Sequence, residues 1–163
     1  MRKALAVIGI AGAMFLPGCS PEPVYEQYME VPGSEWHQGK EFHFVFDITD
    51  TGIPYDITFQ IRNTNRYPYQ NLWLFVLEEK PVGDISQDTV EYFLADDYGK
   101  WLGKGISVYE SSLPVRSNYR FPHEGRYAFV IRHGMRDTTL TGVQEIGMIV
   151  RPCAQPSARR LSE

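Results

Sequence analysis

The chain has 163 residues, a formal net charge of −4 and 43% hydrophobic residues. This length suits a single domain with its own core, and the acidic balance disfavours nucleic acid and anionic lipid headgroups as partners. The chain contains 2 cysteines. A small exported fold held together by several disulfides is therefore excluded.

Residues 1–18 have the features of a lipoprotein signal peptide. Arg2 and Lys3 form a positive start, and the apolar segment that follows is too short to span a bilayer. The segment ends in LPGC, which resembles the bacterial lipobox. In proteins with a lipobox the cysteine, here Cys19, is acylated and the chain is cut before it. The alternative is an ordinary secretory signal with an incidental cysteine.

The remaining chain divides into three parts. Residues 19–23 form a short tether whose acyl chains would hold the protein firmly to a membrane, since one chain alone binds marginally. Residues 24–151 form the domain, and residues 152–163 are rich in Pro, Ser, Ala and Arg and are expected to be a disordered tail. With Cys19 acylated, Cys153 has no partner for a disulfide.

A β-hairpin over residues 55–79 is predicted at the centre of an antiparallel sheet. Ile57, Phe59 and Ile61 alternate with polar residues, as in a half-buried strand. Residues 72–77 are continuously apolar, which favours a fully buried strand. Residues 78–83 then break the pattern, and Pro81 and Gly83 close the strand. The turn formers of residues 63–70 lie between the two strands.

Further strands are expected over residues 24–31, 41–49, 88–94, 106–115, 125–132 and 143–150, with a shaped glycine-rich loop over residues 95–105. Short strands at even spacing, no long helical period, and 9 Phe and 10 Tyr residues predict an all-β fold. We expect a single antiparallel β-sandwich of about eight strands. Jelly-roll connectivity is preferred, and an Ig-like arrangement is the alternative.

No catalytic signature is present in the sequence. It contains neither G-x-S-x-G nor H-E-x-x-H, and its four histidines are scattered. We therefore expect no enzyme activity, no catalytic residues, no metal, no cofactor and no small-molecule substrate. Calcium held by Asp96 and Asp97 beside the glycine-rich loop is a minor alternative, because adjacent loop aspartates are usually just solvated.

Aromatic residues mark two loops as a candidate surface for a partner or ligand. Tyr67 and Tyr69 lie between the two central strands, and Tyr98 and Trp101 lie in the glycine-rich loop. Aromatic side chains anchor protein interfaces and also stack on sugars. The alternative for Trp101 is that it plugs the end of the core, and the two interpretations are equally supported.

Two short segments, DTV and DTT, resemble the Asp-Ser/Thr-apolar pattern of O-glycosylation in Bacteroidota envelope proteins. They make Thr89 and Thr138 possible O-glycosylation sites. A pattern of three residues is weak, and Thr89 falls within a predicted strand.

Four longer phrases carry a family resemblance: IRNTNRYPYQNLWLFV, DTVEYFLADDYGKWLGKG, FPHEGRYAFVIRHGMR and LTGVQEIGMIV. Together with the lipobox, they resemble the gliding motility lipoprotein GldH family of the Bacteroidota, over residues 25–151. The resemblance implies a non-enzymatic envelope lipoprotein that supports gliding motility or the type IX secretion system. Only Cys19 acquires a defined role from it.

The resemblance implies other Gld or type IX secretion envelope proteins as partners, and a membrane contact through the lipid anchor. Residues 20–22 lack the acidic cluster that resembles a surface-export signal in these bacteria. We therefore expect a lipid-anchored outer-membrane protein that faces the periplasm. The alternative is a surface lipoprotein that binds carbohydrate.

Overall fold

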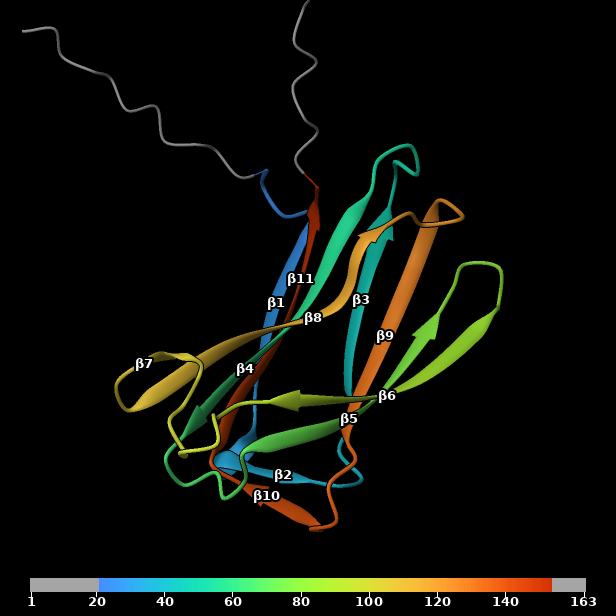
Figure 1. Ribbon diagram of the computed structural model, residues 1–163. Coiled ribbons are helices and arrows are strands. Elements are labelled where there is room, and N and C mark those ends of the chain that lie inside the picture. The colour runs from blue at the N-terminus through green and yellow to red at the C-terminus, as the bar shows by residue number, and fades with distance from the viewer. Residues whose placement is uncertain (1–20, 154–163) are drawn as a thin grey trace, which may run out of the picture.

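The computed structural model describes residues 21–153. In this part of the chain, strands form two antiparallel sheets packed face to face, with a short two-stranded ribbon at one end (Figure 1). The first sheet has the order β1-β11-β4-β8-β7. Its strands are β1 (Tyr25–Glu30), β11 (Val143–Pro152), β4 (Tyr55–Thr64), β8 (Val108–Tyr119) and β7 (Lys104–Gly105).

The second sheet has the order β3-β9-β5-β6. Its strands are β3 (Phe42–Ile48), β9 (Gly125–His133), β5 (Asn71–Glu79) and β6 (Ile85–Phe93). The ribbon pairs β2 (Glu35–His37) with β10 (Thr139–Thr141), and a single 3-10 turn, η1 (Pro32–Ser34), precedes β2.

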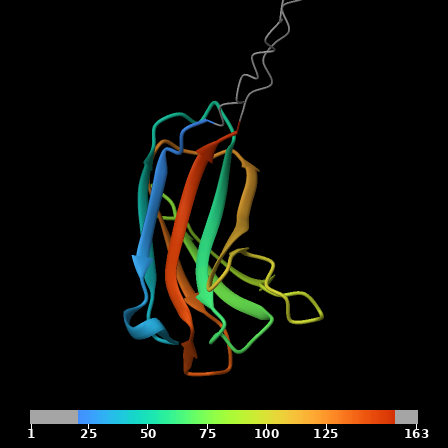
Figure 2. The same ribbon diagram turned by 90° about the vertical axis from the view of Figure 1, so that its left-hand side faces the viewer.

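The connectivity is that of a jelly roll. Four strands of the first sheet, β1, β11, β4 and β8, lie side by side in Figure 2. The chain passes repeatedly between this sheet and the second one, and of the long sequential strands only β5 and β6 pair within one sheet. An eight-stranded double sheet with two Greek keys has this strand order. The predicted all-β sandwich and its jelly-roll form are confirmed, with β2, β7 and β10 as short additions.

The predicted hairpin over residues 55–79 is wrong. β4 lies between β11 and β8 in the first sheet, whereas β5 lies between β9 and β6 in the second. The connection therefore arches from one sheet to the other at the end of the sandwich. Both strands bury one apolar face in the shared core, and a hairpin and an arch produce the same period of two.

β5 also differs from the buried strand that its apolar run predicts. Leu72, Leu74 and Val76 are buried in the core, but Trp73 lies on the outer face of the sheet and is 38% exposed. The apolar pattern ends at Glu78, as expected, but Glu78 still occupies the next inward position, and the strand ends at Glu79. Its run of apolar residues therefore reflects a partly apolar outer face, as well as a core.

Aromatic rings fill the core between the sheets. The predicted alternation in β3 is confirmed, with Phe42, Phe44 and Phe46 buried and the residues between them exposed. Phe121 contacts the rings of Tyr127 and Phe46 at centroid distances of 4.6 and 6.0 Å. Each fully buried side chain of this size contributes about 1.5–3 kcal/mol, so this cluster accounts for much of the stability.

A buried carboxylate bridges the two sheets near their open edge. The Glu78 residue is 2% exposed, and its carboxylate accepts hydrogen bonds from Tyr119 at 3.1 Å and Ser86 at 3.3 Å. The Arg116 guanidinium lies 3.7 Å from the same carboxylate and also bonds Asp88. Burial, with the Glu78 charge, raises the pKa of Tyr119 to about 12, so its hydroxyl remains a donor.

His133, in β9, is a structural histidine. It is fully buried against the edge of the Trp36 ring, at a centroid distance of 5.3 Å, and within residues 21–153 its ring nitrogens have no hydrogen-bond partner of good geometry. Burial lowers the pKa of His133, although the Trp36 backbone and the Asp137 charge oppose this in part. The folded protein therefore holds this imidazole neutral.

This burial predicts a loss of stability in mild acid. Below about pH 6.5 the unfolded chain binds a proton at His133 that the folded chain resists, so the free energy of unfolding falls as the pH falls. Urea unfolding between pH 8 and pH 5 checks this. His133→Leu should flatten the profile, whereas replacement of the exposed His43 by Gln should not. Equal slopes for the wild type and His133→Leu would contradict the assignment.

Some predicted segments lie outside the described residues, namely residues 1–18 with the signal peptide, Cys19, and residues 154–163 of the expected tail. Pro152 is part of β11, and the Cys153 amide donates to the Pro54 carbonyl at 2.9 Å, so the expected tail begins within the fold. Between residues 21 and 153, no helix is long and apolar enough to cross a membrane.

Candidate partner-binding surface

The structure brings the two predicted aromatic loops together. Residues 65–70 join β4 to β5, and residues 94–103 join β6 to β7. The amides of Leu94 and Ala95 both donate to the Gln70 carbonyl, at 2.7 and 3.1 Å. The Trp101 indole Nε1 donates to Asn65 Oδ1 at 2.8 Å. The two loops therefore form one unit at the end of the sandwich.

Tyr67 lies in the core rather than on the surface. It is 3% exposed, and its hydroxyl donates to the Asn71 carbonyl at 2.8 Å. Burial raises the pKa of Tyr67 far above its ordinary value. The arch between the sheets turns this ring inward, because its loop crosses the end of the core. Tyr67 therefore supports the candidate surface from below and cannot contact a partner itself.

Gly142 allows this close packing. Its φ is +84°, and a Cβ at this position would lie 2.4 Å from the backbone nitrogen of Tyr67. The loop backbone thus rests directly on the turn between β10 and β11. Only glycine can adopt this positive φ and let another backbone approach so closely at little cost in free energy.

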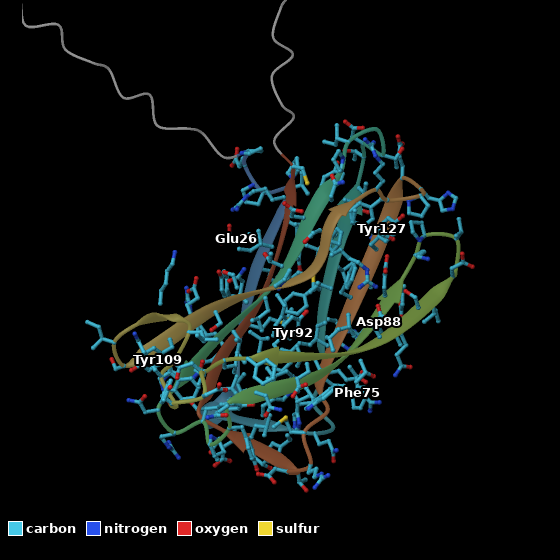
Figure 3. The ribbon with its side chains drawn as sticks, viewed as in Figure 1. Glu26, Phe75, Asp88, Tyr92, Tyr109 and Tyr127 are labelled. Carbon is cyan, nitrogen blue, oxygen red and sulfur yellow. The ribbon has the colours of Figure 1, made fainter. Side chains whose placement is uncertain are left out.

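A row of aromatic rings runs across the two loops. The ring centroids of Tyr69 and Tyr67 are 6.0 Å apart, and those of Tyr67 and Trp101 are 6.3 Å apart. The ring centroids of Trp101 and Tyr109, in β8, are 5.7 Å apart. Figure 3 labels Tyr109 at this end of the molecule. A hydrogen bond from the Tyr69 hydroxyl to Asp137 raises the pKa of Tyr69. Trp101 is half-buried, so it joins the core row and also borders the surface.

The tip of the second loop is a tight turn built by Asp96. Its carboxylate accepts the amides of Tyr98 at 3.0 Å and Lys100 at 2.9 Å, and its carbonyl accepts the Gly99 amide. Tyr98 at the tip is 96% exposed. Asp96 therefore has a structural role, and residues 21–153 hold no group of three side chains suited to a metal ion.

Two exposed apolar residues in this region escape prediction from sequence. Leu102 is 60% exposed and Ile106 is 91% exposed. A hollow of about 600 Å³ lies beside Leu102 and is bordered by Lys104 and Ser111. Leu102 lies between Gly99 and Gly103, and Ile106 follows Gly105 directly, so a glycine beside an isolated apolar residue is the sequence signal that could have identified them. The expected strand over residues 106–115 begins at Val108 instead, which leaves Ile106 in the bend before it.

We define the distal loop surface as Tyr69, Tyr98, Trp101, Leu102 and Ile106. It lies at the end of the sandwich opposite to residue 21 and to the end of β11 (Figure 1). The tether residues therefore join the domain at the far end from this surface. An anchored domain would present the surface away from its point of attachment.

A second hollow, of about 590 Å³, lies on the outer face of the first sheet. Arg62 in β4 bonds the carboxylates of both Glu110 and Glu145, and its guanidinium lies 4.7 Å from the centre of the Tyr28 ring. These three charges are satisfied by one another, and Glu30 and Lys104 also line the hollow.

Both possible O-glycosylation sites are exposed. Thr89 lies on the outer face of β6, opposite Phe75 of β5, and Thr138 lies in the bend before β10. Their exposure is compatible with modification, which remains a prediction. Cys153 is half-buried, and burial with the nearby Asp56 raises the pKa of its thiol, as suits an unreactive cysteine.

The fold and the distal loop surface define a jelly-roll domain that exposes aromatic and apolar side chains at one end. A family model described as GldH lipoprotein matches residues 23–150. The gliding motility lipoprotein GldH homolog of Christiangramia forsetii is 35% identical over 149 residues, which cover 90% of this chain and 91% of the relative. The gliding motility lipoprotein GldH of Flavobacterium johnsoniae is 30% identical over 155 residues, with 90% and 96% covered.

This chain belongs to the GldH lipoprotein family. It is therefore a lipoprotein of the cell envelope, anchored at a membrane. Among solved structures, the infectious bursal disease virus VP2 subviral particle matches with a TM-score of 0.31 and 12% identity, over 90% of this chain and 38% of that chain. This likeness is too slight to bear on function.

Proposed function

We propose that this chain is a non-enzymatic assembly factor for gliding motility or type IX secretion. Acyl chains on Cys19 hold it to the outer membrane, and its domain faces the periplasm. The distal loop surface holds other Gld or secretion proteins of the envelope. The observation that carries this proposal is the exposure of Tyr98 and Leu102 on the loop before β7 and of Ile106 directly after β7, at the end remote from the tether.

Such exposure supports a role in binding rather than in folding. Apolar side chains that are 60–96% exposed contribute little to the core of their own domain. Aromatic residues on rigid supports are typical anchors of protein interfaces. Here the Asp96 turn and the Trp101–Asn65 hydrogen bond hold the loop in place. Binding of a partner would therefore lose little conformational entropy in ordering this loop.

The polar groups of the domain support a non-enzymatic role. The Glu78 carboxylate is hydrogen-bonded in the bridge between the sheets, and the Asp96 carboxylate is hydrogen-bonded in its turn. His133 is buried in the core. Catalysis would require a nucleophile within hydrogen-bond reach of a base that is itself free to exchange protons. These three side chains thus already have structural partners or surroundings.

Carbohydrate binding is the second candidate. A hollow of about 380 Å³ on the outer side of β5 is lined by Tyr69 and Trp73 together with Arg136 and Asp137. Two aromatic faces beside charged groups could stack on a sugar ring and bond its hydroxyls. Glycan binding that is lost in both Tyr69→Ala and Trp73→Ala would favour this function over protein assembly.

Complementation in a gliding relative tests the proposed function. A strain without its own copy of the gene would receive the wild-type chain or Cys19→Ala. We expect the wild type to restore colony spreading and export of secreted proteins, and Cys19→Ala to remain soluble and to restore neither. Full restoration by Cys19→Ala would contradict the need for an anchor, and failure of both chains would contradict the proposed process.

A further inference from the structure

β6 forms a long unprotected edge of the second sheet. Among the described strands it pairs only with β5, so one side of its nine residues is open. Open edges in monomeric proteins are usually shortened, charged or interrupted by proline. The sequence of β6, ISQDTVEYF, contains neither lysine nor proline, and its two carboxylates, Asp88 and Glu91, are held by Arg116 and Asn71 of the same chain. It is rich in residues that favour strands.

The other outer strands carry such protection. β1 has 6 residues and two glutamates, β7 has 2 residues and a lysine, and the open part of β8 contains Pro114. β3 faces β1, where the ring of Tyr25 lies 5.1 Å from that of Phe46. β6 is therefore the edge most open to pairing with another strand.

The register of β6 shows which residues face the open side. The Leu94 amide donates to the Gln70 carbonyl, one position beyond the Asn71–Phe93 pair. Hydrogen-bonded pairs alternate along an antiparallel ladder, so even-numbered residues of β6 bond to β5. The odd-numbered residues then present their amides and carbonyls to the open edge, and their exposed side chains line one face: Ile85, Gln87, Thr89, Glu91 and Phe93.

These five residues are complementary to themselves when two copies run antiparallel about Thr89. Thr89 then pairs with Thr89 of the second copy, Gln87 with Glu91, and Ile85 with Phe93. Ile85 and Phe93 are 65% and 62% exposed in one chain, and each would cover the other. Threonine pairs, amide–carboxylate pairs and apolar pairs all stabilise antiparallel strands, and no like charges meet.

The neighbouring charges allow this pairing. Asp88 points to the inner side, where Arg116 of its own chain neutralises it, and Figure 3 shows Asp88 and Tyr92 on β6. The Asn71 side-chain amide donates a hydrogen bond to the Glu91 carboxylate on the outer face. The remaining lone pairs of this carboxylate can accept a hydrogen bond from the Gln87 amide of the second copy.

We propose that β6 pairs with β6 of a second copy of this chain, antiparallel and with Thr89 on the two-fold axis. The two second sheets would then join into one continuous sheet, and the open edge would be removed. The proposal does not rest on the distal loop surface, although Phe93 of β6 and Leu102 of that surface line the same hollow.

Charge substitution tests the register. The full chain, solubilised in nonionic detergent, is expected to sediment as a protein dimer. Thr89→Lys places two like charges opposite each other on the axis and should weaken the dimer by about tenfold or more. Gln87→Lys adds the same charge two residues away, opposite Glu91, and should keep the dimer. A monomeric wild type, or equal effects of the two lysines, would overturn the proposal.

Cysteine crosslinking gives a second measurement in cells. In a Cys153→Ser background, Thr89→Cys should form a disulfide-linked or short-maleimide-linked dimer. Gln87→Cys and Glu91→Cys should crosslink with each other when both chains are produced, and far less when each is produced alone. Crosslinking of Thr89→Cys no greater than that of Thr138→Cys, an exposed control, would also overturn it.

Discussion

Replacement of Tyr67 by Ala is expected to lower the free energy of unfolding by about 3–5 kcal/mol, the usual cost of removing a buried aromatic side chain. The ring is 3% exposed, contacts Tyr69 and Trp101, and donates a hydrogen bond to the Asn71 carbonyl. Its removal opens a cavity under both loops and leaves that carbonyl without its donor. Urea unfolding of the purified chain in detergent measures the change.

Tyr98→Ala is the matched control for this substitution. The same side chain is removed from the same pair of loops, but at a position that is 96% exposed. Its effect on unfolding should stay within about 0.5 kcal/mol, the usual range for surface substitutions. Similar losses in the two variants would show that Tyr67 does not hold the end of the core, and the structural role assigned to it would be wrong.

Replacement of Trp101 by Ala is expected to abolish capture of a partner while the domain remains folded. Trp101 borders the distal loop surface, and large aromatic side chains there are the strongest candidates for binding hot spots, worth about 2 kcal/mol or more. Half of its ring also packs on Tyr67 and Tyr109, so some loss of stability is expected too. Recovery of crosslinked partners and urea unfolding should be measured on the same samples.

Two further variants separate binding from stability. Trp73→Ala removes a partly exposed tryptophan from the outer face of β5, and should leave capture by the distal loop surface unchanged. Ile106→Ser changes a side chain that is 91% exposed, and should weaken capture without affecting unfolding. If Trp101→Ala unfolds the domain, Trp101 is a core residue. If it captures partners normally, Trp101 is not part of the interface.

The sheet content of the fold follows from local pattern, but its pairing does not. Alternation in β3 and β9 fixes which side chains face the core, because side chains in a strand alternate between faces. The same alternation in β4 and β5 does not reveal their partners, which come from β11, β8, β9 and β6. Pairing depends on contacts distant in sequence, so the arch at residues 65–70 resembles a hairpin loop in the sequence.

The candidate site shows the same division. The sequence identifies the two loops by their aromatic residues, and the structure places them in contact through Trp101 and Asn65. It does not distinguish Tyr67, which turns inward, from Tyr98, which points outward, because loops have no period that encodes burial. Leu102 is missed for the same reason, and Ile106 is missed because the expected strand starts two residues too early.

The central claim, an anchored chain that holds envelope proteins through its distal loop surface, is tested most directly by capture from cells. Cells that carry a tagged full chain would be crosslinked, their envelopes solubilised, and the copurifying proteins identified by mass spectrometry. We predict recovery of other Gld lipoproteins or type IX secretion subunits with the wild type and Trp73→Ala, and their loss with Trp101→Ala and Cys19→Ala. Recovery of glycan-uptake proteins instead, or of no specific protein, would contradict the account.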